Sequence, residues 1–153
     1  MRFEIERINE ENYSRFDDMV FWRENGYERK HVQMAVSEQI KKELSNPNLH
    51  IYAVNADDRY VGWISLVYIP KVGRWKGRGH VYVDELWVAP DYRRQNLGKE
   101  LMKKADELVA ASGAAGARLY VNTENRGAIA LYEQCGYQEN CKTFFMEKNI
   151  FEE

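Results

Sequence analysis

Residues 81–102 constrain the fold more than any other stretch of the chain. They open as an apolar run that ends at Val88, and Pro90 stops the run because proline has no N–H for a sheet ladder. Past Asn96, apolar residues recur at helical spacing on one face: Leu97, Leu101, Ala105 and Leu108. The stretch therefore predicts a strand, a tight turn and a helix.

The predicted turn is suited to holding a phosphate. The first N–H groups of a helix have no partner inside the helix, and the helix dipole favours negative charge at that end. Arg93, Arg94 and Lys99 add positive charge around the same point. We expect a phosphate or pyrophosphate to bind there.

Length and composition indicate one globular domain over residues 1–153. Hydrophobic residues make up 44% of the chain and charged residues 30%. The formal net charge of −2 lacks the basic excess of a dedicated nucleic-acid binder. Neither the two cysteines, Cys135 and Cys141, nor the three histidines have metal-ligand spacing, so we assign no metal. The N-terminus has no apolar signal core, and no stretch approaches the ~20 apolar residues of a membrane span. A cytoplasmic setting without a membrane partner is expected.

The segments before the central stretch predict three strands and two helices. They are a strand over 3–8, helices over 9–25 and 28–44, and a hairpin of strands over 50–55 and 60–69.

The segments after the central stretch predict a strand over 118–122, a helix over 128–135 and closing strands over 137–140 and 143–148. Helices interleaved with strands indicate a mixed α/β (α+β) fold, with helices on both faces of one sheet.

Residues 88–98, Val-Ala-Pro-Asp-Tyr-Arg-Arg-Gln-Asn-Leu-Gly, resemble the acetyl-CoA-binding motif of the GNAT superfamily of N-acetyltransferases. The core of that motif is Gln/Arg-x-x-Gly-x-Gly/Ala, and Arg93 and Gly98 match its ends. Asn96 stands where the family usually has glycine. This departure is mild because asparagine tolerates positive φ.

Residues 125–137 resemble a second GNAT pattern, Asn-x-x-Ala-x-x-Leu-Tyr-x-x-x-Gly-Phe/Tyr. The matching positions are Asn125, Ala128, Leu131, Tyr132, Gly136 and Tyr137. The resemblance implies a mostly antiparallel mixed sheet that splays between its fourth and fifth strands, with acetyl-CoA as co-substrate in the gap. It also implies a set of CoA-binding residues: Leu86, Trp87, Val88, Arg93, Arg94, Gln95, Asn96, Leu97, Gly98, Lys99 and Asn125.

Three side chains are candidates for catalysis. In the family, the tyrosine that Tyr132 matches points at the thioester sulfur, where a protonated phenol can assist the leaving thiolate. The alternative is a core aromatic on an apolar helix face. Asp84 and Glu85 interrupt the central strand, where they either hold and deprotonate an amine or mark an exposed end of the strand. Alternation puts Asp84 on one face with Tyr82, Leu86 and Val88, and Glu85 on the other with Val83 and Trp87. We favour Asp84 as the base, unless a bulge reverses the faces.

An acceptor site is expected around the first helix, a region that often lines this site in GNAT proteins. Its candidates are Trp22, Glu24 and Tyr27, with Tyr82 from the central strand; acidic and aromatic side chains suit a cation. The alternative is a solvated helix face. The basic loop 71–78 either attracts an anionic partner or is a solvated hairpin.

The leading hypothesis is an acetyl-CoA-dependent N-acetyltransferase in which an amine attacks the thioester directly within a ternary complex. The acceptor is a small-molecule or peptide amine, and the resemblance suggests a homodimer. A non-catalytic CoA-binding sensor on the same fold is the alternative. An RNA-modifying enzyme is more remote, because only the basic loop suggests it.

Overall fold

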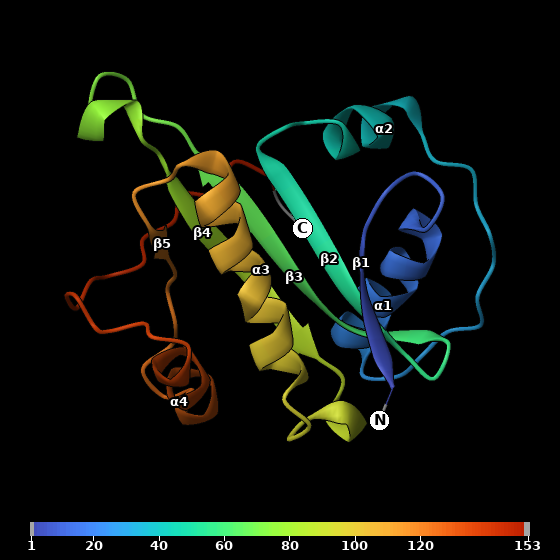
Figure 1. Ribbon diagram of the computed structural model, residues 1–153. Coiled ribbons are helices and arrows are strands. Elements are labelled where there is room, and N and C mark those ends of the chain that lie inside the picture. Colours follow the sequence, from blue (N-terminus) through green and yellow to red (C-terminus); the bar gives the residue numbers. More distant parts are fainter. Residues whose placement is uncertain (1, 152–153) are drawn as a thin grey trace.

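The computed structural model describes residues 2–151; residue 1 and residues 152–153 lie outside that range. Five strands form one sheet in the order β1-β2-β3-β4-β5 (Figure 1). They are β1 Phe3–Arg7, β2 Leu49–Ala56, β3 Arg59–Ile69, β4 His80–Val88 and β5 Ala117–Arg118. Pairing is antiparallel from β1 to β4 and parallel between β4 and β5. The predicted mixed, mostly antiparallel sheet is confirmed.

Helices cover both faces of this sheet (Figure 1). They are α1 Tyr13–Asn25, α2 Glu38–Leu44, α3 Leu97–Ser112 and α4 Arg126–Gln134. Leu97 and Leu101 of α3 pack with Ile64 in one buried cluster, while Phe16 of α1 packs with Trp63 in another. Neighbouring strand residues point to opposite faces, so α1 and α3 lie on opposite sides of the sheet.

The predicted strand, turn and helix around residues 81–102 are confirmed. After β4, a short 3-10 turn, Pro90–Tyr92, leads into α3. Arg94 and Asn96 both adopt φ of 63°. Asparagine tolerates this left-handed conformation well, which explains why it can stand in a glycine position. The predicted β2–β3 hairpin is confirmed too, and its turn residues Asp57 and Asp58 both have positive φ, as its twist requires.

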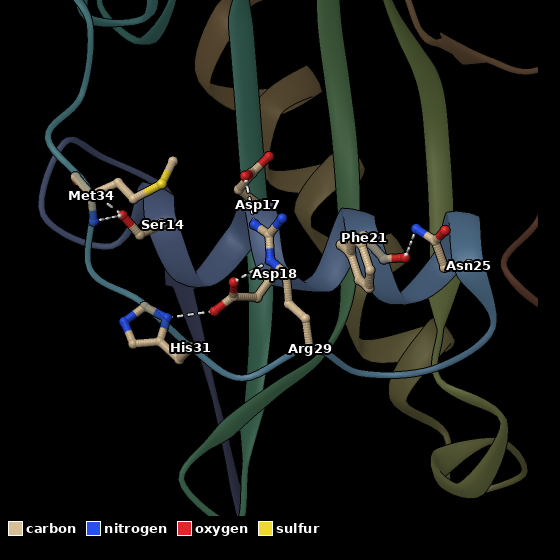
Figure 2. A network of polar contacts seen from close by, with 8 residues as sticks. All are labelled: Ser14, Asp17, Asp18, Phe21, Asn25, Arg29, His31 and Met34. Carbon is tan, nitrogen blue, oxygen red and sulfur yellow. Dashed lines mark hydrogen bonds and ion pairs between the residues drawn. The ribbon is translucent and has the colours of Figure 1, made fainter.

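The second helix is much shorter than predicted. Instead of spanning 28–44, α2 begins after Ser37, whose Oγ accepts a hydrogen bond from Ile40 N at 3.2 Å. Such an N-cap marks a helix start. Residues 27–37 cross α1 without regular structure, and Ser14 anchors them by exchanging hydrogen bonds with the Met34 backbone (Figure 2).

The C-terminal part also departs from the prediction. The fifth strand covers only Ala117–Arg118 instead of 118–122, and the predicted strands over 137–140 and 143–148 are wrong: the structure describes these residues and finds no strand there. A strand needs a neighbouring edge to pair with, and β5 ends before it offers one. Five large apolar side chains are left exposed: Phe144, Phe145, Met146, Ile150 and Phe151.

None of the helices within residues 2–151 is long and apolar enough to cross a membrane.

Candidate active site

The sheet opens between β4 and β5. The two strands pair only through Val81 with Ala117 and Tyr82 with Arg118. Beyond Tyr82, within the described residues, β4 continues to Val88 without a partner on that side, while the chain after β5 turns away towards α4 (Figure 1). The predicted splay is thus present, and it exposes backbone N–H and C=O groups of β4.

A cluster of free amides lies at the end of this open edge. The first backbone bond to the start of α3 runs from Glu100 N to Asn96 O at 3.0 Å, so the earlier amides of the helix have no intrahelical acceptor. Arg93 Nε donates to Val88 O at 2.9 Å and fastens the turn to the end of β4. The guanidinium of Arg93 therefore has a structural contact in addition to its positive charge.

The two sequence motifs meet in space. An added Cβ on Gly98 of α3 would lie 3.1 Å from Leu131 Cδ2 of α4, so glycine permits the close approach of these helices. Asn125 Oδ1 accepts from Ala128 N at 3.2 Å and caps α4. This cap is a local role that the family resemblance did not include.

Tyr132 of α4 is half-buried against the core, with its ring 6.3 Å from that of Tyr137. Desolvation, followed by the nearby Cys135 thiol, raises the pKa of Tyr132. The phenol is consequently protonated throughout the neutral pH range and able to donate a hydrogen bond.

β4 contains a bulge at the point where the sheet opens. Ser65 of β3 pairs with Glu85 and Leu66 pairs with Val83, which leaves Asp84 as an extra residue without a β3 partner in this register. A bulge disrupts the ladder and changes the directions of the side chains around it.

The bulge overturns the predicted faces of β4. Directly paired residues share a face, and the pairs concerned are Trp63–Trp87, Ser65–Glu85 and Val67–Tyr82. Glu85 therefore lies with Tyr82 and Trp87 on the α1 face. The assignment of Glu85 to the face of Val83 was wrong, and so was the grouping of Tyr82 with Leu86 and Val88, because simple alternation does not count the extra residue, Asp84.

The two neighbouring carboxylates differ in their surroundings. Desolvation, followed by the charge of Glu85, raises the pKa of Asp84. Glu85 instead forms an ion pair, with its Oε2 2.7 Å from Arg23 Nη1 of α1. One acid is thus shifted towards its protonated form while the other is held by a cation.

Aromatic rings line the α1 face beside Glu85. Trp87 lies between Trp22 and Trp63, with ring centroids 5.4 and 5.3 Å away. Tyr82 at the opening lies 6.0 Å from the ring of Tyr120, in the segment after β5. An aromatic wall next to a carboxylate suits an organic cation.

Sequence reasoning missed Arg23, Trp63 and Tyr120. Arg23 follows the candidate Trp22 directly, but nothing local shows that it reaches a carboxylate 62 positions later. Of the predicted acceptor residues, Trp22 and Tyr82 lie on this face. Tyr27 packs its ring on Phe21, 5.5 Å away, and is largely exposed. Glu24 is exposed as well.

A separate hollow of about 280 Å³ lies between α1, the segment after it and the β2–β3 hairpin. Its lining comprises Arg15, Asp18, Met19, Trp22, Glu28, Arg29, His31, Asp58, Arg59 and Tyr60. Arg29 and His31 hold Asp18 (Figure 2), and Arg59 Nη1 lies 2.9 Å from Glu28 Oε2. These charged side chains of the hollow are thus paired with one another.

Two cations of the basic loop 71–78 contact an aromatic ring of the same loop. Arg74 and Lys71 lie 4.7 and 5.9 Å from the ring centroid of Trp75. These contacts favour the local, solvated interpretation of the loop.

Comparison with known families matches residues 8–137 to the acetyltransferase (GNAT) family. A bovine thialysine N-epsilon-acetyltransferase is 34% identical over 73 residues, which cover 48% of this chain and 42% of the relative. A mouse protein of the same name is 37% identical over 65 residues, covering 42% and 38%. The chain therefore matches less than half the length of these relatives. A Caenorhabditis elegans protein of that name matches 88% of the chain and 82% of its own length at 24% identity.

Solved structures share the fold at low identity. An aminoglycoside acetyltransferase from an uncultured soil metagenomic sample, in complex with trehalose, superposes with a TM-score of 0.77 at 19% identity, covering 96% of this chain and 97% of that one. AAC(6')-Iy, solved with the bisubstrate analogue CoA-S-monomethyl-acetylneamine, has a TM-score of 0.76 at 14% identity, with coverage of 97% and 99%.

Proposed function

Because the chain belongs to the acetyltransferase (GNAT) family, we propose that it transfers an acetyl group from acetyl-CoA to a primary amine by direct attack within a ternary complex. The observation that carries this proposal is the opening between β4 and β5, which joins a cluster of free amides at one end to two carboxylates at the other.

The amides of residues 94–99 are proposed to hold the pyrophosphate of acetyl-CoA. A helix N-terminus favours an anion, and Arg94 and Lys99 add charge. The exposed edge of β4 over Leu86 to Val88 is suited to hydrogen-bond the pantetheine arm as an added strand would. Bound there, the thioester supplies the acetyl group, with a thiolate as its leaving group.

Tyr132 is proposed to donate a hydrogen bond or proton to that thiolate. Its raised pKa keeps the phenol protonated at neutral pH. Such assistance contributes typically about 10²–10⁴-fold to a rate.

Asp84 and Glu85 are proposed to receive the amine. A lysine-like amine has a pKa of about 10.4, so it must lose a proton before it attacks. Asp84 remains our candidate for the base: it lies at the bulge beside the opening, and desolvation followed by the charge of Glu85 raises its pKa. Glu85, on the aromatic α1 face, is suited to hold the ammonium.

We further propose a small cationic amine as acceptor. Supporting this are the carboxylates next to Trp87 and relatives named for acetylation at an ε-nitrogen. A homodimer is proposed as the assembled form, because the exposed apolar side chains of residues 144–151 call for a partner surface.

The test is acetylation of an amine panel with mass detection. The panel holds lysine, thialysine, a linear diamine, a polyamine, an aminoglycoside and a lysine peptide. We expect a mass gain of one acetyl group on at least one amine, dependent on acetyl-CoA. Binding of acetyl-CoA without transfer to any member would contradict the proposal and favour a CoA-binding sensor.

A further inference from the structure

Arg23 occupies the place beside Glu85 where a cationic substrate would bind. Its Nη1 lies 2.7 Å from Glu85 Oε2, and its Cζ lies 5.4 Å from the ring centroid of Trp63. The residue thus combines a carboxylate contact with a position over an indole ring, the two interactions that an organic ammonium would make.

The Arg23–Glu85 pair is easily exchanged. The two side chains are 41% and 40% exposed, and ion pairs this exposed to water contribute little to stability. Releasing Arg23 into solvent costs little, provided that another cation replaces it at Glu85.

The local charge favours such a replacement. With Arg23 absent, the bulge presents two adjacent carboxylates, Asp84 and Glu85, at the edge of the sheet opening. Like charges so close repel each other, and after desolvation the charge of Glu85 is the second cause that raises the pKa of Asp84. A cation beside Glu85, supplied either by the chain or by the acceptor, reduces this repulsion.

We propose that Arg23 is an internal stand-in for the acceptor: it occupies the ammonium subsite at Glu85 until a linear alkylammonium substrate displaces it, and so sets acceptor specificity. This inference rests on the proposed N-acetyltransferase function. An arginine side chain is a flexible alkyl stem that ends in a cation. A ligand that replaces it needs the same form, as in a lysine-like amine or a polyamine, and not the rigid rings of an aminoglycoside.

The kinetic test compares Arg23→Gln with the wild type on linear and ring amines. Each linear amine must displace Arg23 when it binds, and this costs part of its binding free energy. Replacing Arg23 by glutamine should therefore lower the KM of linear amines about two- to fivefold and leave kcat unchanged. The gain should shrink at high salt, because screening already weakens the exposed pair. Arg23→Met, which keeps an apolar stem, should behave alike, and Arg23→Lys should restore most of the wild-type KM.

Arg29→Gln is the matched control. It also removes an arginine that pairs with carboxylates of α1, Asp17 and Asp18, but it lies at the separate hollow. Its KM for linear amines should equal that of the wild type. An unchanged or raised KM in both Arg23→Gln and Arg23→Met would overturn the proposal, the raised value indicating that Arg23 positions Glu85. A gain limited to ring amines would overturn it as well.

Binding without turnover separates this inference from the proposed function. Linear diamine is titrated into protein saturated with CoA, with intrinsic tryptophan fluorescence as the signal, since Arg23 lies over Trp63. The wild type should show a fluorescence change that Arg23→Gln lacks, and calorimetric titration of the same diamine should show tighter binding to the variant. That result would stand even if no amine were acetylated. Equal signals and equal affinities in both proteins would refute the displacement.

Discussion

Tyr132 and Tyr137 are two partly buried phenols of similar setting, and only one of them faces a proposed chemical task. The Tyr137 hydroxyl is buried and has no hydrogen-bond partner among the described residues. Burial raises the pKa of Tyr137 to about 12. A Tyr→Phe substitution removes one hydroxyl at either position, so Tyr132 and Tyr137 can be compared directly within one cluster.

Tyr132→Phe should keep CoA affinity and slow acetyl transfer by about 10²–10⁴-fold, because a general acid is lost. Tyr137→Phe is its control: this variant should keep the rate, and its Tm should not fall, because it removes an unpaired buried hydroxyl. Single-turnover transfer rates and CoA titrations measure both effects. A full rate in folded Tyr132→Phe, with chemistry limiting, would mean that this tyrosine only packs.

Asp84 combines a cost in stability with its proposed role as base. Its folded-state pKa is raised, so the folded chain binds the proton more tightly than the unfolded chain, and ionisation destabilises the fold. Asp84→Asn should therefore raise Tm at about pH 7, and the gain should disappear near pH 3, where both states are protonated. Because the carboxyl is partly exposed, the gain should stay below ~1 kcal/mol.

The same substitution that raises Tm should lower activity. Asp84→Asn should lower kcat or raise the acceptor KM while acetyl-CoA affinity stays near wild type. The exposed Glu133→Gln on α4 serves as a control for both measurements. Should Glu85→Gln prove the more damaging variant and Asp84→Asn nearly silent, the roles of the two carboxylates are exchanged.

Between elements, the contact of α3 with α4 joins the two motifs. Gly98→Ala places a methyl group 3.1 Å from the flexible end of Leu131, which can shift by a few tenths of an ångström. This variant should fold with CoA affinity reduced only slightly. Gly98→Glu should abolish CoA binding, since its carboxylate would take the place of the phosphate. Calorimetry with CoA measures both, and circular dichroism checks the fold. Wild-type affinity in folded Gly98→Glu would exclude this phosphate site.

The predictable elements are those that local chemistry specifies. The strand, turn and helix around Pro90 follow from neighbouring residues, and so does the end of α3 at Gly113 with φ of 69°. The bulge at Asp84 depends instead on how β3 pairs with β4. The Arg23–Glu85 pair depends on how α1 crosses the sheet. The sequence could therefore name the candidate residues, but not the face of the sheet on which Glu85 lies.

For the helix predicted over 28–44, local periodicity was misleading. Val32, Val36, Ile40 and Leu44 have helical spacing. Yet Ser37 caps α2 and the preceding residues contact α1 through Arg29 and Met34. Tertiary contacts outweighed a weak intrinsic preference there.

For the whole molecule, the apolar residues of the 144–151 segment predict self-association. Its five exposed side chains present on the order of 700 Å², close to the ~800 Å² per partner of a standard interface. The chain should elute as a dimer in size exclusion with light scattering. Phe144→Ser combined with Phe145→Ser should shift it to monomer. Val72→Ser, which removes an exposed apolar side chain of the basic loop instead, should leave the dimer intact. A monomeric wild type would refute the homodimer.

The short pairing of β5 also affects how often this part of the protein opens locally. Strands β1 to β4 pair along most of their length, whereas the region from Ala117 to Tyr137 pairs with β4 through two residues only and is otherwise joined by side-chain packing on the core and on α3. Such a region opens at lower free energy than the sheet it borders. Amide hydrogens of α4 should exchange with deuterium well before those of β3. A cofactor bound across the opening would connect β4 with the region from Ala117 to Tyr137 and slow that exchange. The ligand would then supply packing contacts that the protein itself lacks between these two parts.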